Sequence, residues 1–306
     1  MATSESIIEL NVGRQSLGIA PSVGGGLTHW RLDRKSSPRD LLRPADPATL
    51  AARDPRALSC FPLVPYSNRI RHGRFPFMGR TVAMPLNFGD HPHSIHGLGW
   101  QAPWQVSTQS ADRVRLSHRH AGEGGDGPGW PFAYRAEQTI ALDPDGLTLT
   151  LEVGNEAGVP MPLGLGQHPY FAHPETAVLT ADVNRVWQAD REVMPTHATP
   201  LPARWPLTAG ARVSELDCDN LFAGWRGPAR IAWPDAGLVL TLSAGPEIER
   251  LVVYTPPGEN FFCVEPVSQL TDAFNLAARG RRDTGMRILA PGERARLTMR
   301  LALQED

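Results

Sequence analysis

Hydrophobic and polar residues alternate along many short stretches of the chain. In residues 147–153, leucine or valine occupies every second position and threonine or glutamate stands between. Successive side chains of a strand point to opposite faces, so this pattern predicts a strand with one buried face. The same pattern predicts further strands over residues 113–117, 134–142, 177–183, 238–242, 250–255 and 295–301.

Turn-forming residues separate these stretches along the whole chain. Glycine and proline number 29 each, and the Asp-Pro-Asp-Gly at residues 143–146 predicts a turn before the strand at 147. Short alternating runs between frequent turns are typical of an all-β sandwich or barrel. Only residues 47–53 and 269–278 carry a helical signal, for one or two turns each. No repeat and no break in composition divides the chain, which predicts a single domain over residues 1–306.

One run of strand-forming residues ends on a carboxylate. Residues 261–266 read Phe-Phe-Cys-Val-Glu-Pro, and alternation places Phe261, Cys263 and Glu265 on one face of a strand that Pro266 ends. Apolar neighbours disfavour the charged form of Glu265 and make it a stronger base once it is ionised. The alternative is a structural ion pair between this glutamate and an arginine.

Composition and charge narrow the class of protein. The chain is 41% hydrophobic, which is enough for a sizeable core. Its net charge of −2 gives no basic surface, so we expect no nucleic-acid or anionic-membrane partner.

Three widely spaced cysteines without a C-x-x-C pair fit a reducing compartment. The first ten residues form no signal-type apolar core, and no apolar run reaches about 18 residues, so we expect a cytoplasmic protein. The glycine-rich residues 121–129 lack the Lys-Ser/Thr of a phosphate loop and predict a surface loop.

The densest group of histidines lies in residues 91–100 and comprises His91, His93 and His96. A zinc site needs three or four converging ligands, and cupin-type sites add a nearby carboxylate. No acidic residue follows His96 until Asp112, so we expect no metal, and a cupin-like metalloenzyme stays as an alternative.

The glycines and the tryptophan after these histidines suggest a ligand site. Gly97 and Gly99 suit a backbone that approaches a ligand closely. Trp100 suits either a sugar-stacking face or the core. A second segment of similar composition, residues 164–171, combines glycines with His168 and two aromatic residues, although a single histidine is often structural.

Two polar segments complete the set of candidate residues. Residues 68–75 begin with Asn68 and Arg69 and contain three arginines, which either lie solvated on an edge strand or offer guanidinium donors to a polar ligand. Residues 216–222 place Asp219 before an aromatic residue, and the alternative there is a capped turn.

Taken in chain order, these segments resemble the aldose 1-epimerase (galactose mutarotase-like) family. The glycine turn at residues 24–27 is similar to the opening of that family. The matching pieces follow one another in the order of the family: Asn68-Arg69-Ile70, His96-Gly97, His168-Pro169-Tyr170-Phe171, Asp219 before Phe222, and Glu265 ahead of residues 272–275.

The resemblance implies a large antiparallel β-sandwich, the galactose mutarotase-like supersandwich, with a few short helices and an open concave face that binds a monosaccharide. It implies that Glu265 is the general base and His168 the general acid of a mutarotase that needs no cofactor. Such a mechanism needs an ionised Glu265 and a protonated His168, so activity should fall at both low and high pH. The resemblance also implies that His96 belongs to the catalytic residues, where it holds the sugar. The residues expected to bind the substrate are Arg69, Asp219, Asn68 and Trp100.

Several alternatives stay open within this resemblance. The Leu98-Gly99-Trp100 that follows the first histidine segment departs from the usual family pattern. Arg71 and Arg74 would serve a phosphate if the substrate were a hexose 6-phosphate, or else lie on the surface. A carbohydrate-binding protein without turnover would keep the same fold. The sequence assigns no role to His72, His91 and His93. It also leaves the identity of the sugar and the oligomeric state open.

Overall fold

Two large antiparallel sheets make up most of the computed structural model, which describes residues 7–35, 38–122 and 129–305. Most of the loop predicted at residues 121–129 lies outside the described residues. Among the described residues, no helix is long and apolar enough to cross a membrane.

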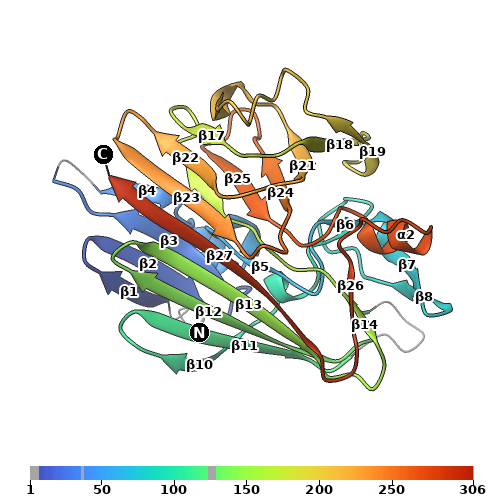
Figure 1. The fold of residues 1–306 in the computed structure, drawn as a ribbon. Helices are drawn as coiled ribbons and strands as arrows, with labels where there is room; N and C mark the ends of the chain where they lie inside the picture. Colours follow the sequence, from blue (N-terminus) through green and yellow to red (C-terminus); the bar gives the residue numbers. More distant parts are fainter. Residues whose placement is uncertain (1–6, 36–37, 123–128, 306) are drawn as a thin grey trace.

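The first sheet carries the glutamate identified in the sequence. Its ten strands follow the order β1-β2-β3-β4-β16-β25-β24-β21-β18-β19 (Figure 1). Their bounds are β1 (Ile8–Val12), β2 (Gln15–Ala20), β3 (Gly26–Leu32), β4 (Arg39–Leu42), β16 (Tyr170–Ala172), β25 (Phe261–Pro266), β24 (Arg250–Tyr254), β21 (Asp219–Ala223), β18 (Arg185–Ala189) and β19 (Pro195–Pro200).

The second sheet contains nine strands in the order β10-β11-β12-β13-β27-β23-β22-β17-β20. The bounds are β10 (Gln105–Gln109), β11 (Arg113–His120), β12 (Tyr134–Asp143), β13 (Gly146–Asn155), β27 (Arg294–Glu305), β23 (Leu238–Ala244), β22 (Ala229–Trp233), β17 (Val178–Thr180) and β20 (Ala211–Arg212).

Short strand pairs, two helices and four 3-10 turns connect the sheets within the described residues. The pairs are β14 (Met161–Leu163) with β26 (Arg287–Leu289), β15 (Gly166–Gln167) with β5 (Pro62–Leu63), β6 (Arg69–Ile70) with β9 (Ser94–Ile95), and β7 (Arg74–Phe77) with β8 (Arg80–Ala83). The helical elements are α1 (Pro47–Ala51), α2 (Ala273–Ala278), η1 (Pro55–Ala57), η2 (Arg71–Gly73), η3 (Gly99–Gln101) and η4 (Val213–Glu215).

The alternating pattern places the core between the two sheets. In β12 and β13, every second side chain is buried, and the two strands pair from Tyr134–Asn155 to Asp143–Gly146 through the predicted turn. Across the core, the Gln138 side chain donates a hydrogen bond to the Gly25 carbonyl, which joins the second sheet to the first. The predicted all-β sandwich fold is therefore confirmed.

Two predicted elements are shorter than their sequence patterns. The strand expected over residues 177–183 covers only β17, because the Ala181 amide turns away to donate to the Leu207 carbonyl. The helix expected over residues 269–278 begins at Ala273, because Leu270 is bonded to the Thr284 carbonyl outside any helix.

The strand order of the first sheet positions the candidate site. β16 lies between β4 and β25, so that Tyr170 pairs with Cys263 and Phe171 pairs with Leu42. β24 then lies between β25 and β21, which brings Asp219 opposite Tyr254. Segments near residues 42, 170, 219 and 265 thereby meet on neighbouring strands.

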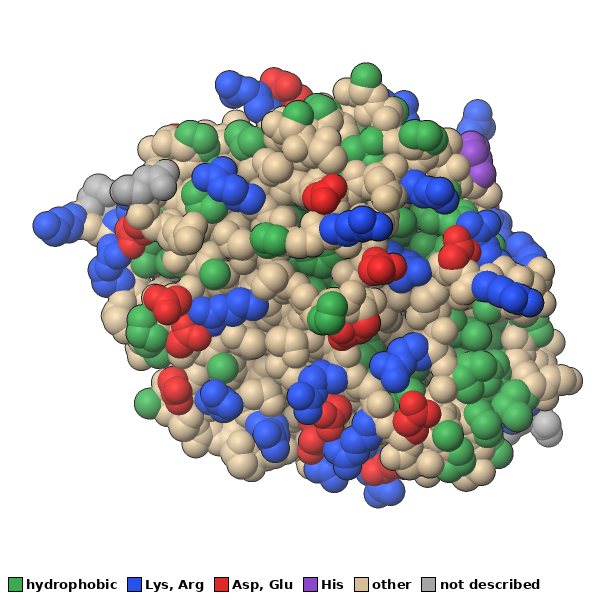
Figure 2. Space-filling model, in the orientation of Figure 1, with side chains coloured by type: hydrophobic (Ala, Val, Ile, Leu, Met, Phe, Trp, Pro, Cys, Tyr) green, Lys and Arg blue, Asp and Glu red, His purple; other side chains and the backbone are tan. Residues whose placement is uncertain are grey.

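Charged side chains of both signs are interspersed over the face shown in Figure 2, and no single basic patch gathers there. This distribution matches the near-neutral net charge of −2. The absence of a nucleic-acid partner stays a prediction from the sequence.

Candidate active site

Glu265 lies near the end of β25, buried among apolar residues. Only 2% of the residue is exposed, and Cys263 occupies the same strand face, as the alternation predicts. Burial, and then the charge of Asp219, raise the pKa of Glu265 well above its usual range, while Arg69 opposes the rise. One of its oxygens, Oε2, has no protein partner.

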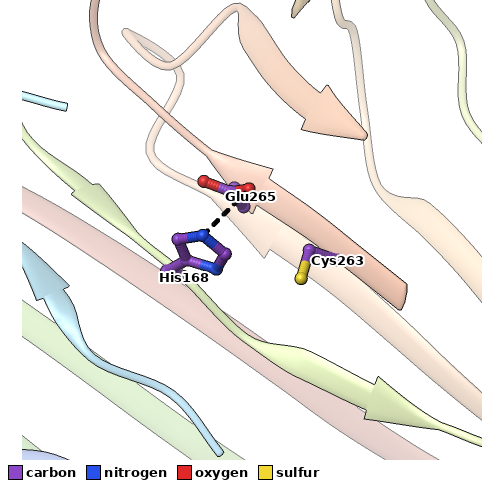
Figure 3. Close-up of side chains that lie close together, drawn as sticks. All are labelled: His168, Cys263 and Glu265. Carbon is purple, nitrogen blue, oxygen red and sulfur yellow. Dashed lines mark ion pairs between the residues drawn. The ribbon is translucent and has the colours of Figure 1, made fainter. Parts of the chain in front are cut away.

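His168 faces this carboxylate from the segment between β15 and β16. Its Nε2 lies 3.5 Å from Oε1 of Glu265, as Figure 3 shows, and its backbone amide donates to the Phe61 carbonyl. Burial, followed by the positive charges of Arg43 and Arg69, lowers the pKa of His168 to about 3. The structure thus brings the predicted acid and base together, and favours the state with the proton on Glu265 and a neutral imidazole.

His96 occupies the third position at the site, after the short strand β9. Its Nδ1 accepts a hydrogen bond from the Asn68 amide, and its ring meets His168 edge to face at 5.1 Å. Burial and then the charges of His168 and Arg69 lower the pKa of His96 well below its usual range. A neutral His96 whose Nδ1 accepts a hydrogen bond carries its own hydrogen on Nε2, so it is a hydrogen-bond donor rather than an acid.

Asn68, Arg69 and Asp219 form a polar chain beside these histidines. The Asn68 side-chain oxygen accepts hydrogen bonds from the backbone amide and the guanidinium of Arg69, at 2.8 and 3.3 Å. Arg69 lies 3.5 Å from the Asp219 carboxylate, and its Nε has no protein partner. Burial raises the pKa of Asp219, which Arg69 opposes. The Arg69 side chain is only 11% exposed, so the solvated edge-strand interpretation is wrong for Arg69, whereas Arg74 is exposed on β7.

All seven predicted site residues line one cavity of about 150 Å³, which at ~30 Å³ per water holds about five waters. Trp100 is fully buried and stacks on Phe61 at 5.4 Å, so it forms the wall as part of the core. The cavity is also lined by seven residues outside the predicted set, of which Ile95, Tyr170, Val252 and Tyr254 lie within segments named from the sequence: Arg56, Phe61, Phe88, Ile95, Tyr170, Val252 and Tyr254.

The remaining histidines of the dense cluster do not converge on a metal site. His93 is fully buried, its Nδ1 accepts a hydrogen bond from the His72 amide, and its Nε2 lies 3.3 Å from Glu192 in the turn between β18 and β19. Arg71 pairs with the same turn through Asp190 at 3.3 Å. His93 and Arg71 therefore attach this turn to the segment that carries Arg69.

Among the described residues, the potential metal ligands that gather within 4.8 Å are His168, Cys263 and Glu265. Burial raises the pKa of the Cys263 thiol well above its usual range, and this residue does not line the cavity. A thiol kept protonated is a poor metal ligand. The absence of a catalytic metal stays a prediction.

Gly97 allows a close contact with another backbone segment rather than with a ligand. Its φ is +73°, and a Cβ there would lie 2.1 Å from the Val64 carbonyl oxygen. The close approach of this glycine is therefore to the neighbouring chain segment at Val64.

Comparisons with known proteins identify the family of this chain. The sequence pattern of the aldose 1-epimerase family matches residues 6–302. The uncharacterized Escherichia coli (strain K12) protein YphB is 29% identical over 307 residues, and the match covers 98% of this chain and 99% of YphB.

Solved structures share the fold. A galactose mutarotase-like protein from Clostridium acetobutylicum superposes with a TM-score of 0.87 at 20% identity, covering 98% of this chain and 95% of that one. A galactose 1-epimerase from Lactobacillus acidophilus NCFM gives 0.77 at 15% identity, with the same coverage of 98% and 95%. The fold is thus shared along the whole chain, and because the family pattern also spans it, the chain belongs to the aldose 1-epimerase family.

Proposed function

We propose that this protein is an aldose 1-epimerase that interconverts the α and β anomers of a monosaccharide by acid–base ring opening and closure. The observation that carries the proposal is the His168–Glu265 pair, 3.5 Å apart in the wall of a small polar cavity. A protein that only binds sugar needs hydrogen bonds and stacking, and has no need of a buried acid and base.

Ring opening requires that His168 and Glu265 together carry one proton. Glu265 takes the proton of the anomeric hydroxyl while His168 gives a proton to the ring oxygen, and the ring opens to the free carbonyl. The carbonyl end rotates, and the ring closes as the proton returns to His168 and Glu265 gives its proton back to the carbonyl oxygen. Protons balance, because ring opening only moves the pair's single proton from His168 to Glu265.

Burial favours the proton arrangement that ring opening produces. The raised pKa of Glu265 and the lowered pKa of His168 both stabilise the neutral pair, so the form that starts ring opening is the less populated one. The two pH limits of activity belong to the pair. The low-pH limit then reports mainly protonation of His168, and the high-pH limit reports mainly loss of the proton from Glu265, the reverse of the assignment expected from the sequence.

The other lining residues suit a polyol. The Nε2–H of His96 and the guanidinium of Arg69 are donors, the Asp219 carboxylate is an acceptor, and Trp100 and Phe61 give an apolar wall. Aromatic walls with a few fixed polar groups are typical of small-molecule sites. These residues would orient the sugar so that its anomeric hydroxyl meets Glu265.

The charges favour a free sugar over a hexose 6-phosphate. Of the two arginines in the cavity wall, Arg69 is paired with Asp219 at 3.5 Å and Arg56 with Asp54 at 2.6 Å. Arg71 and Arg74 do not line the cavity. A phosphate would therefore compete with carboxylates for both guanidinium groups.

Polarimetry on freshly dissolved aldoses and their 6-phosphates tests the proposal. We expect mutarotation faster than the uncatalysed rate for at least one neutral aldose, and little acceleration for its 6-phosphate. Acceleration confined to 6-phosphates would contradict the choice of a neutral sugar. Binding of an aldose, seen by calorimetry, with no acceleration of any anomer would instead favour a carbohydrate-binding protein.

A further inference from the structure

Two residues behind His168 form an ordered stack with its ring. The Tyr170 ring lies parallel to the His168 imidazole, with centroids 4.6 Å apart and an interplanar angle of 6°. The Arg43 guanidinium carbon lies 3.8 Å from the Tyr170 centroid. These distances are too short for both groups to share one face of the ring, so Tyr170 lies between Arg43 and His168.

The backbone of the first sheet fixes this order. Arg43 directly follows β4, and its amide donates to the Tyr170 carbonyl at 2.9 Å, at the point where β16 begins. The guanidinium donates to the carbonyls of Arg56 and Leu58. A second ring, Phe261, lies 4.2 Å from the same guanidinium carbon. The cation is thus held by carbonyl groups and aromatic faces rather than left free in solvent.

We propose that Arg43 and Tyr170 are positioning residues for His168: Tyr170 fixes the plane of the imidazole against Glu265, and the Arg43 charge behind the ring disfavours an imidazolium. The value of this arrangement to the reaction rests on the proposed function, since it makes protonated His168 a stronger acid toward the ring oxygen. Nothing in the stack touches the reacting bond directly except His168.

Among the charged and titratable groups around His168, Arg43 has the largest electrostatic effect on the imidazole. Glu265 faces the Nε2 of His168, and the His96 ring lies 5.1 Å from the His168 ring. The Cys263 sulfur lies within 4.8 Å of a ring nitrogen of His168 and of a carboxylate oxygen of Glu265. The pKa values of the Cys263 thiol and of the Tyr170 hydroxyl are raised well above their usual range and that of His96 is lowered, so all three are neutral at neutral pH. After burial, Arg43 is the largest cause that lowers the pKa of His168, ahead of Arg69.

Titration of the His168 ring by NMR in the sugar-free protein tests the charge effect. Coulomb's law at an effective dielectric of ~20 gives about 2 kcal/mol, or roughly 1.5 pH units, for a charge roughly 8 Å away. We therefore expect the protonated fraction of His168 in Arg43→Met to be about thirtyfold higher than in wild type at pH values well above the pKa of the ring in both proteins. The His168→Asn spectrum identifies the resonance.

A matched control is available in the same chain. Arg204 lies over the Trp205 ring at 4.2 Å, so Arg204→Met removes a cation–π contact away from the cavity. It should leave the His168 titration as in wild type. Equal titration of His168 in wild type and folded Arg43→Met, or an equal shift in Arg204→Met, would overturn the charge effect.

The position of the ring is tested without changing Arg43. In wild type, the Tyr170 ring current should shift the His168 ring protons upfield. The shift should be retained in Tyr170→Phe and reduced in Tyr170→Leu, where the Phe61 ring at 4.8 Å remains. Tyr170→Leu should also lower kcat more than it changes KM. Unshifted ring protons in wild type would overturn the stack. Because the NMR readouts need no sugar, they remain decisive even if the protein fails to accelerate mutarotation.

Discussion

Glu265 and His168 should behave as one catalytic unit, and a double-mutant cycle measures this. Glu265→Gln keeps the shape of the side chain but cannot accept the proton, and His168→Asn is no general acid. Positioned proton transfer contributes about 10²- to 10⁴-fold in rate, so each single variant should lose roughly that factor while sugar still binds. This loss corresponds to about 3 to 5 kcal/mol of transition-state stabilisation.

The distance between the two groups sets the size of their coupling. Unit charges 3.5 Å apart at an effective dielectric of ~20 interact by about 5 kcal/mol, well above one pK unit. The two groups therefore share their proton rather than titrate independently. Additive losses would slow the double variant by about 10⁴- to 10⁸-fold, whereas we expect it to be about as slow as the slower single variant, a coupling of about 3 to 5 kcal/mol.

Polarimetry of a fresh aldose, with the uncatalysed rate subtracted, gives the rates, and calorimetry gives the affinity. A second histidine–glutamate pair supplies the control, because His173 and Glu175 are also 3.5 Å apart but lie exposed at the surface. His173→Asn and Glu175→Gln should leave both rate and affinity unchanged. Additive losses in the catalytic pair, or a folded Glu265→Gln protein that binds sugar and turns over normally, would refute the shared-proton mechanism.

Three further predictions follow from the same site. Burial raises the pKa of Glu265 in the folded protein above its unfolded value of ~4.3, so wild-type stability falls as pH rises from the unfolded to the folded pKa, by up to about 1.4 kcal/mol per pH unit. Urea unfolding should find Glu265→Gln more stable than wild type at pH 7.5 and similar to it at pH 4. A variant less stable than wild type at both pH values would point to a structural ion pair instead. Arg69→Ala should weaken sugar binding and also slow turnover, because a misplaced substrate loses rate as well as affinity; wild-type values for both would place Arg69 outside the site. Treatment with a chelator should leave mutarotation unchanged, and loss of activity together with stoichiometric bound zinc would favour a metalloenzyme.

The strands could be predicted because their signal is local. Residues 147–153 alternate over their whole length, residues 238–242 alternate except at Val239, and both form central strands of the second sheet. Where a predicted strand proved shorter, as at β17, the chain found a partner outside the sheet that alternation does not encode. The order of short motifs likewise indicated Glu265, His168 and Asp219 before any contact between them was known.

The sequence alone therefore predicted the all-β class, the family and seven of the residues that line the cavity. Only the tertiary structure decided which side chains lie behind them: Tyr170 stacks on His168, Arg43 lies over the Tyr170 ring, and Phe61 and Tyr254 line the wall. It also decided the direction in which burial shifts the two pKa values, that of Glu265 upward and that of His168 downward. The physical reason is that alternation and motif order are carried by neighbours in the chain, whereas burial, stacking and charge proximity arise only when distant segments pack together.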